Sequence, residues 1–266
     1  AVVASLTLVA CSALGTAATT TTTAAGGTSS TLAASAAAAL ADNVESHAED
    51  GDTEYDATDA TTITLADGAS TTSSSDGVRI DGDTVTITAP GTYVLTGTLA
   101  DGQVVVDSDA EGKVRIVLDN ASITNADGSA LVITAADEAV VVLADGSSNS
   151  LTDGTGYDTS SDDAPNAALF SMADLTIGGT GPLTVIGNTG DGIASKDGLV
   201  ISGGTITVTA VDDGIRGKDY LIVTGGTVTV DAEDDGLKSD NETDDTVGYV
   251  LVQGGTVTVA AGDEIA

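Results

Sequence analysis

The sequence predicts an all-β protein, a β-solenoid in which about 22 residues form each coil of the C-terminal part. The tripeptide Asp191-Gly192-Ile193 returns twice at one constant interval, as Asp213-Gly214-Ile215 and Asp235-Gly236-Leu237. A Gly-Gly-Thr motif starts at Gly203, Gly225 and Gly254. The first and second copies of this motif are as far apart as the Asp-Gly motifs are. The second and third copies are farther apart, which indicates an insertion around 241–248. Aromatic residues make up only 2% of the chain, which suits thin coils that bury small β-branched side chains together.

Charge and composition exclude several classes of function. The chain has 41 acidic and 7 basic residues and a net charge of −34, so sequence-independent binding to nucleic acid is excluded. Cys11 and His47 are the single cysteine and histidine. Together they leave no intrachain disulfide and no Cys/His zinc cluster, and they disfavour a thiol- or histidine-based triad.

The N-terminal segment indicates export. Residues 1–11 are apolar and too short to span a bilayer, so we interpret them as the remnant of a signal peptide. Their end, Leu8-Val9-Ala10-Cys11, resembles a bacterial lipobox, in which Cys11 would carry the lipid that anchors the protein outside the cell. The alternative is an ordinary signal peptide with an incidental cysteine.

The rest of the chain divides into two parts. Residues 12–76 are rich in Thr, Ser, Ala and Asp, which predicts a disordered tether. Residues 77–266 form the predicted solenoid, which we expect to be truncated because the last repeat is incomplete. Within it, runs of alternating or continuous Val, Ile and Leu predict strands, at 85–88, 104–106, 114–118, 130–133, 140–143, 205–209 and 227–230.

The constant spacing of the Asp-Gly motif predicts a column of carboxylates. Asp191, Asp213 and Asp235 would stack about 4.8 Å apart, with Asp212 and Asp234 beside them. Carboxylates at that distance repel each other by ~3.5 kcal/mol at an effective dielectric constant of 20. A shared cation relieves this repulsion, and several oxygens from successive coils suit Ca²⁺ better than Mg²⁺. The simpler alternative is turn chemistry, in which Asp bonds to its own backbone and Gly supplies a positive φ.

Four of the seven basic residues follow these motifs within a few positions: Lys196, Arg216, Lys218 and Lys238. Such bases can bind the carboxylate of an acidic sugar, or they can form ladders that neutralise the aspartates. Neighbouring carboxylates raise the pKa of a lysine, which argues against a role as a catalytic base.

The three consecutive units resemble one known family. The segments 190–198, 212–220 and 234–241, the last followed by Gly254-Gly255-Thr256, are similar to bacterial carbohydrate-binding domains. Those domains are built on a pectate-lyase-like, right-handed parallel β-helix. The resemblance implies a secreted or surface-attached protein that binds acidic polysaccharide. It also implies calcium held by Asp191, Asp212, Asp213, Asp234, Asp235 and Asp240. The first unit departs from the pattern because Gly190 replaces the first aspartate.

Three functions follow from these features. The first is non-catalytic, calcium-dependent binding of a polygalacturonate-like polymer at the cell surface. The second is a calcium-dependent polysaccharide lyase, with Lys218 or Lys238 as the candidate base. The third is a structural surface protein or adhesin in which calcium provides rigidity only.

Overall fold

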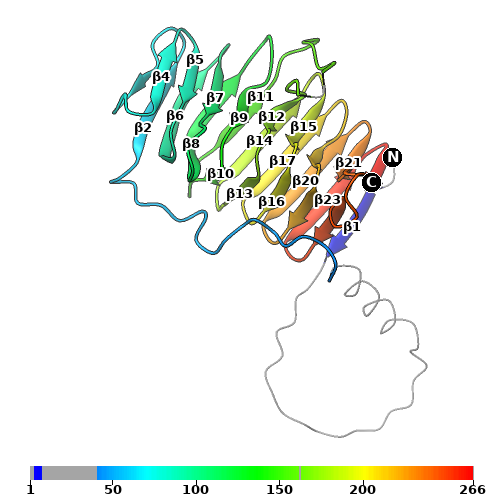
Figure 1. The fold of residues 1–266 in the computed structure, drawn as a ribbon. Coiled ribbons are helices and arrows are strands. Elements are labelled where there is room, and N and C mark those ends of the chain that lie inside the picture. Colours follow the sequence, from blue (N-terminus) through cyan, green and yellow to red (C-terminus); the bar gives the residue numbers. More distant parts are fainter. Residues whose placement is uncertain (1–2, 8–40, 162, 266) are drawn as a thin grey trace, which may run out of the picture.

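The computed structural model describes residues 3–7, 41–161 and 163–265. These residues form an all-β structure whose strands stack in register, almost all of them in parallel (Figure 1). The strands belong to one sheet of 15 strands and one of 9, and the chain alternates between the two. The predicted stack of parallel strands is therefore confirmed, while the right-handed turn of a β-helix stays a prediction.

The stack has three faces, each named here by what lies on it. The strap face consists of β6 (Gly91–Leu99), β8 (Lys113–Thr124), β10 (Glu138–Leu143), β13 (Leu175–Gly179), β16 (Gly198–Ile201), β19 (Tyr220–Val223) and β22 (Tyr249–Val252). The threonine face continues from the second half of β8 into β11 (Asn149–Thr152), β14 (Pro182–Gly187), β17 (Thr205–Ala210), β20 (Thr227–Ala232) and β23 (Thr256–Ala260).

The aspartate face is the nine-stranded sheet. It consists of β4 (Val78–Asp81), β5 (Thr84–Ile87), β7 (Gln103–Asp107), β9 (Leu131–Ala135), β12 (Ala167–Ser171), β15 (Asp191–Ser195), β18 (Ile215–Gly217), β21 (Asp235–Lys238) and β24 (Asp263–Ile265). β4 runs antiparallel to β5 at the N-terminal end, and the other pairs are parallel.

The register confirms the repeat. Ile193 pairs with Ile215, and Thr205 with Thr227, so each residue pairs with its equivalent in the next repeat. Thr227 then pairs with Thr256 across the longer interval, because the insertion forms the loop between β21 and β22. Residues of one type therefore lie directly above one another in successive coils.

Burial follows from this stacking. On β17 and β20, exposed residues alternate with buried Ile, Val and Ala, so that each strand contributes one row to the core. Each fully buried Val, Leu or Ile contributes about 1.5–3 kcal/mol to stability. By contrast, β16 and β19 are buried on both sides. The outer side of these two strands is covered by another part of the chain.

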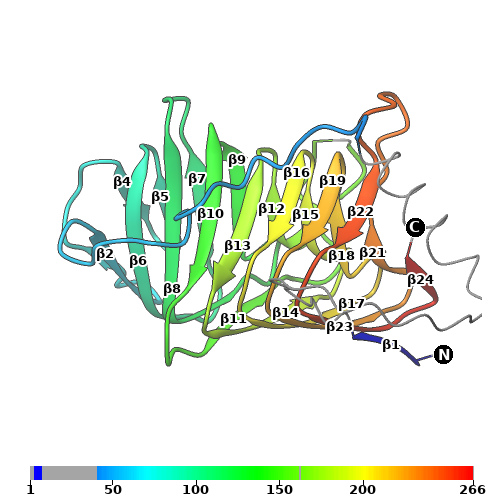
Figure 2. The same cartoon turned by 90° about the horizontal axis from the view of Figure 1, so that it is seen from below.

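The covering part is a strap, residues 41–60, that runs along the strap face from the β22 end to the β2 end (Figures 1 and 2). Near its start, the Val44 N–H donates to the carbonyl of Thr246 at 2.8 Å. At its far end, the buried carboxylate of Asp52 pairs with Lys113 on β8.

After the strap, β2 (Thr61–Ala66) pairs parallel to β6, and β3 (Thr71–Thr72) pairs antiparallel to β2. The described part of the expected tether, 41–76, is thus packed on the stack rather than disordered. The polar sequence of the strap has no repeat, so sequence analysis did not indicate that it packs on the stack.

Cys11 and residues 12–40 lie outside the described residues. Within the predicted signal segment, β1 (Val3–Thr7) pairs antiparallel with β23. The described ranges contain no helix long and apolar enough to cross a membrane.

The glycine of the Asp-Gly motif serves close packing rather than a turn. Neither Gly192 nor Gly214 has a positive φ, unlike Gly204 in the Gly-Gly-Thr motif at 90°. A Cβ on Gly192 would collide with the side chain of Val208 on β17, and one on Gly214 would collide with Val230 on β20. The turn interpretation of the Asp-Gly repeat is therefore wrong for these two glycines.

We expect Gly214→Ala to lower the free energy of unfolding by about 1–3 kcal/mol or more, because the added methyl group overpacks the core. Gly128→Ala is the control, since its Cβ would meet only the side-chain amide nitrogen of Asn125, at 3.3 Å. Urea denaturation of both variants measures the difference. Equal stability of the two would contradict this packing role.

Candidate functional site

The predicted aspartate column exists. Asp191 begins β15, Asp213 lies just before β18, and Asp235 begins β21. All three side chains are buried, with exposed fractions of 1%, 4% and 6%. Each coil bonds to the next, since the N–H of Asp213 donates to Oδ1 of Asp191 at 3.3 Å and that of Asp235 to Oδ1 of Asp213 at 3.2 Å. The carboxylates thus accept bonds from neighbouring coils rather than from their own turns.

Two groups of carboxylates have the geometry of a metal site. The first aspartate group is Asp191, Asp212 and Asp213, and the second is Asp213, Asp234 and Asp235. In each group, one oxygen from each residue lies within 4.8 Å of the others. Asp212 and Asp234 are exposed, so each group opens to solvent on one side. Asp213 belongs to both groups.

Asn166 extends the first aspartate group and was missed in the sequence. Its Nδ2 donates to Oδ2 of Asp191 at 2.9 Å, while its Oδ1 is buried without a hydrogen-bond partner among the described residues. An unpartnered buried oxygen is costly, and amide oxygens are ligands of Ca²⁺. Asn166 lies one coil before the first Asp-Gly motif, where no repeat points to it.

The two bases on the column behave differently. Lys238 lies between two carboxylates, with Nζ 3.0 Å from Oδ2 of Asp213 and 2.8 Å from Oδ2 of Asp235. Burial opposes its charge, but the hydrogen bonds to Asp235 and Asp213 outweigh burial and raise the pKa of Lys238. Arg216 instead bonds to Asp240 at 2.6 Å. Asp240, predicted as a metal ligand, is therefore the partner of an arginine.

Arg216 and two further bases line a hollow of about 310 Å³. Its lining residues are Asp163, Met172, Lys196, Arg216 and Lys218. Nζ of Lys196 lies 5.8 Å from the ring centre of Phe170. Burial and the charge of Arg216 lower the pKa of Lys196. The structure thus brings these three bases together, whereas Lys238 belongs to the column.

Burial and repulsion within the column raise the pKa of Asp191. Burial, together with the negative charge of Asp213, raises the pKa of Asp191 to about 7. Burial also raises the pKa of Asp213, although the bonds from Lys238 oppose this shift. A divalent cation in the first aspartate group would oppose the shift at Asp191, because a nearby positive charge favours the ionised carboxylate.

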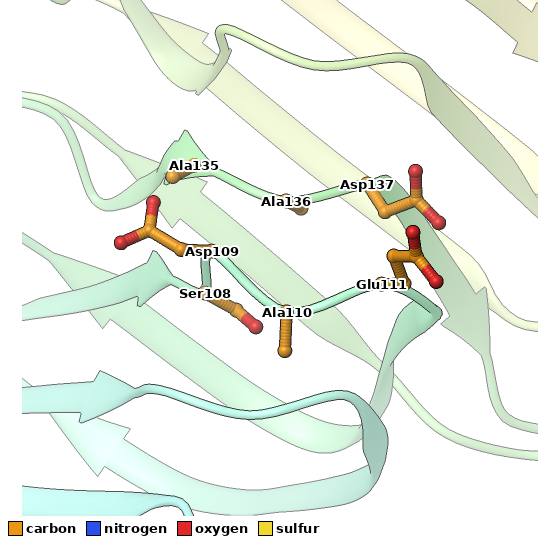
Figure 3. Close-up of a pocket in the computed structure, with 7 residues that line it drawn as sticks. All are labelled: Ser108, Asp109, Ala110, Glu111, Ala135, Ala136 and Asp137. Carbon is orange, nitrogen blue, oxygen red and sulfur yellow. The ribbon is translucent and has the colours of Figure 1, made fainter.

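Two other features do not form a comparable site. Tyr220 is 4% exposed and its hydroxyl accepts a bond from the His47 N–H of the strap, so it offers no platform for sugar rings. A hollow of about 210 Å³ near β7 and β9 is lined by alanines, Ser108 and acidic residues (Figure 3). In the described part of the chain, no base lines it. The carboxylates of Glu111 and Asp137 lie together at one end.

Because the pKa of Asp191 is raised, we expect the stability of the chelator-treated protein to depend on pH. The stabilising contribution of the protonated carboxyl is complete below pH 3.8, the ordinary pKa, and is lost as the pH rises to about 7. We expect Asp191→Asn to stabilise the protein more at about pH 8 than at about pH 4, by on the order of 2–4 kcal/mol. Urea denaturation at both pH values measures this, and an effect independent of pH would refute the assignment.

Comparison with known proteins identifies the family of the chain. The family model of carbohydrate-binding domain-containing proteins matches residues 81–265. A protein of this description from Acetivibrio thermocellus is 40% identical over 137 residues, which are 51% of this chain and 48% of that protein. The match thus spans about half the length of that relative.

One solved structure is similar to this chain in both fold and sequence. It is described as the polysaccharide lyase-like protein from C. thermocellum, gadolinium derivative. It is 33% identical and has a TM-score of 0.73, over 77% of this chain and 93% of that chain. With a family match over most of its length and this shared fold, the chain belongs to the family of carbohydrate-binding domain-containing proteins.

Proposed function

We propose that the protein binds acidic polysaccharide of the polygalacturonate type at the cell surface, through calcium and without catalysis. The observation that carries this proposal is the aspartate column, in which buried carboxylates from successive coils gather beside a hollow lined by three bases. Family membership supports a carbohydrate as the ligand.

Calcium fits the donor set. Ca²⁺ takes six to eight oxygen ligands with flexible geometry, and the first aspartate group offers carboxylate oxygens from three residues. Asn166 bonds to Asp191 through its Nδ2, and its Oδ1 is buried without a hydrogen-bond partner among the described residues. The solved relative is described as a gadolinium derivative, and Gd³⁺ is likewise a hard cation that takes oxygen ligands.

The charge of the protein explains why the metal is needed. A net charge of −34 repels a polyanion, so a uronate chain approaches only where cations offset the field. Calcium on the column would bridge protein and sugar carboxylates. Lys196, Arg216 and Lys218 in the hollow would pair with a further carboxylate of the same polymer.

The proposed location at the cell surface rests on the resemblance of residues 8–11 to a lipobox. In this proposal, Cys11 carries the lipid anchor and the protein acts outside the cell. The membrane is then contacted only through that anchor.

We expect polygalacturonate to retard the protein in affinity electrophoresis with Ca²⁺, and a chelator to abolish this retardation. Asp213→Asn should weaken binding at least tenfold, about 1.4 kcal/mol, because both aspartate groups share this residue. Asp109→Asn, with the same charge change near β7, is the control. Binding that survives chelation would refute the proposal. A large thermal shift with Ca²⁺ but no retention would assign calcium to rigidity alone.

A lyase is the second candidate, favoured by the polysaccharide lyase-like neighbour and by the lowered pKa of Lys196. Lys238 is unsuited as the base because its two carboxylate partners hold its proton. We expect no unsaturated product when pectate and Ca²⁺ are incubated with the protein, as followed by ultraviolet absorbance. Product formation that Lys196→Gln abolishes would instead establish the lyase.

A further inference from the structure

The two aspartate groups are built from equivalent positions, but a different base lies over each. Arg216 on β18 pairs in register with Lys238 on β21. Each base follows the aspartate of its own coil, Asp213 or Asp235, by three residues. If both bases contacted the aspartates of their groups equally closely, they would neutralise the two groups to the same extent.

Lys238 occupies the second aspartate group. Its Nζ lies 3.2 Å from Oδ1 of Asp213, 3.0 Å from Oδ2 of Asp213 and 2.8 Å from Oδ2 of Asp235. A Ca²⁺ ion bound by the same oxygens would lie about 2.3–2.6 Å from them. The ammonium therefore lies where the metal would lie, and the two cations exclude each other.

Arg216 lies farther from the first aspartate group than Lys238 lies from the second. It bonds at 2.6 Å to Asp240, and its contact with Asp191 is 3.8 Å long. The reason lies in the sequence, because positions 196 and 218 hold lysines while the equivalent position of the next coil holds Asp240. That carboxylate draws the guanidinium away from the column.

We propose that Lys238 is an internal cation that closes the second aspartate group, so that the column holds one calcium ion, at Asp191, Asp212 and Asp213. This inference rests on the proposed calcium dependence. Two observations support it independently: the contacts of Lys238, and Asn166, which bonds to Asp191 through Nδ2 while its Oδ1 has no hydrogen-bond partner among the described residues.

The test is the stoichiometry of metal binding to the purified protein, measured by calorimetric titration with Ca²⁺ and by luminescence titration with Tb³⁺. We expect one ion for the wild type. Lys238→Gln should bind two, because the substitution removes the ammonium while keeping a side chain of similar length. Arg79→Gln, which removes one positive charge at an exposed position on β4 far from the column, should still bind one.

A double variant tests the location of the second ion. Lys238→Gln combined with Asp234→Asn should return to one ion, because Asp234 is the exposed ligand of the second aspartate group. Far-UV circular dichroism confirms that each variant is folded. Since Asp234 and Lys238 are not core residues, both variants are expected to fold.

The outcomes separate the two proposals. Two ions in the wild type, or one ion in both the wild type and Lys238→Gln, would overturn the role of Lys238 and leave calcium binding intact. No ion in any variant would overturn calcium binding itself, and the role of Lys238 with it.

Discussion

In-register stacking of parallel coils is the constraint on which the structure depends. Each residue of the repeat lies directly above its equivalent in the previous coil. For Ile and Val this stacking builds a continuous core. For Asp it concentrates charge in one column, because Asp191, Asp213 and Asp235 are all buried. The rest of the architecture offsets that charge, through backbone donors from the neighbouring coil, Lys238, and an opening to solvent through Asp212 and Asp234.

The three faces differ in the side chains that stacking places on their outer sides. The threonine face leaves its outer row in water, where hydroxyls are solvated. The strap face is apolar on its outer side, and Ala48 of the strap packs near Tyr220 and Ile222. The aspartate face carries the column of buried aspartates with Lys238, whereas the strap face carries the buried pair of Asp52 and Lys113. In the proposed function, a ligand that brings its own negative charge would bind at the aspartate face.

The sequence repeat made the strand register and the aspartate column predictable. Identical spacing of the Asp-Gly and Gly-Gly-Thr motifs indicated the register, and the register placed the aspartates in one column. Features that occur once were not predictable in this way. The strap looked like a tether because its polar sequence packs through a few specific contacts, such as that of His47 with Tyr220. Asn166 has no repeat, and the turn of Arg216 toward Asp240 depends on side-chain geometry that spacing does not encode.

The direction of the strap has a mechanical consequence. It enters at the β22 end, beside the coils that hold the aspartate groups, and runs back to the β2 end (Figure 2). A tether attached at residue 41 would therefore pull from the same end as the candidate binding site. Tension along the strap is shared among contacts spaced along the stack, at Thr246, Tyr220 and Lys113. A polymer held on the aspartate face and an anchor at residue 41 would therefore load neighbouring coils at the same end of the stack.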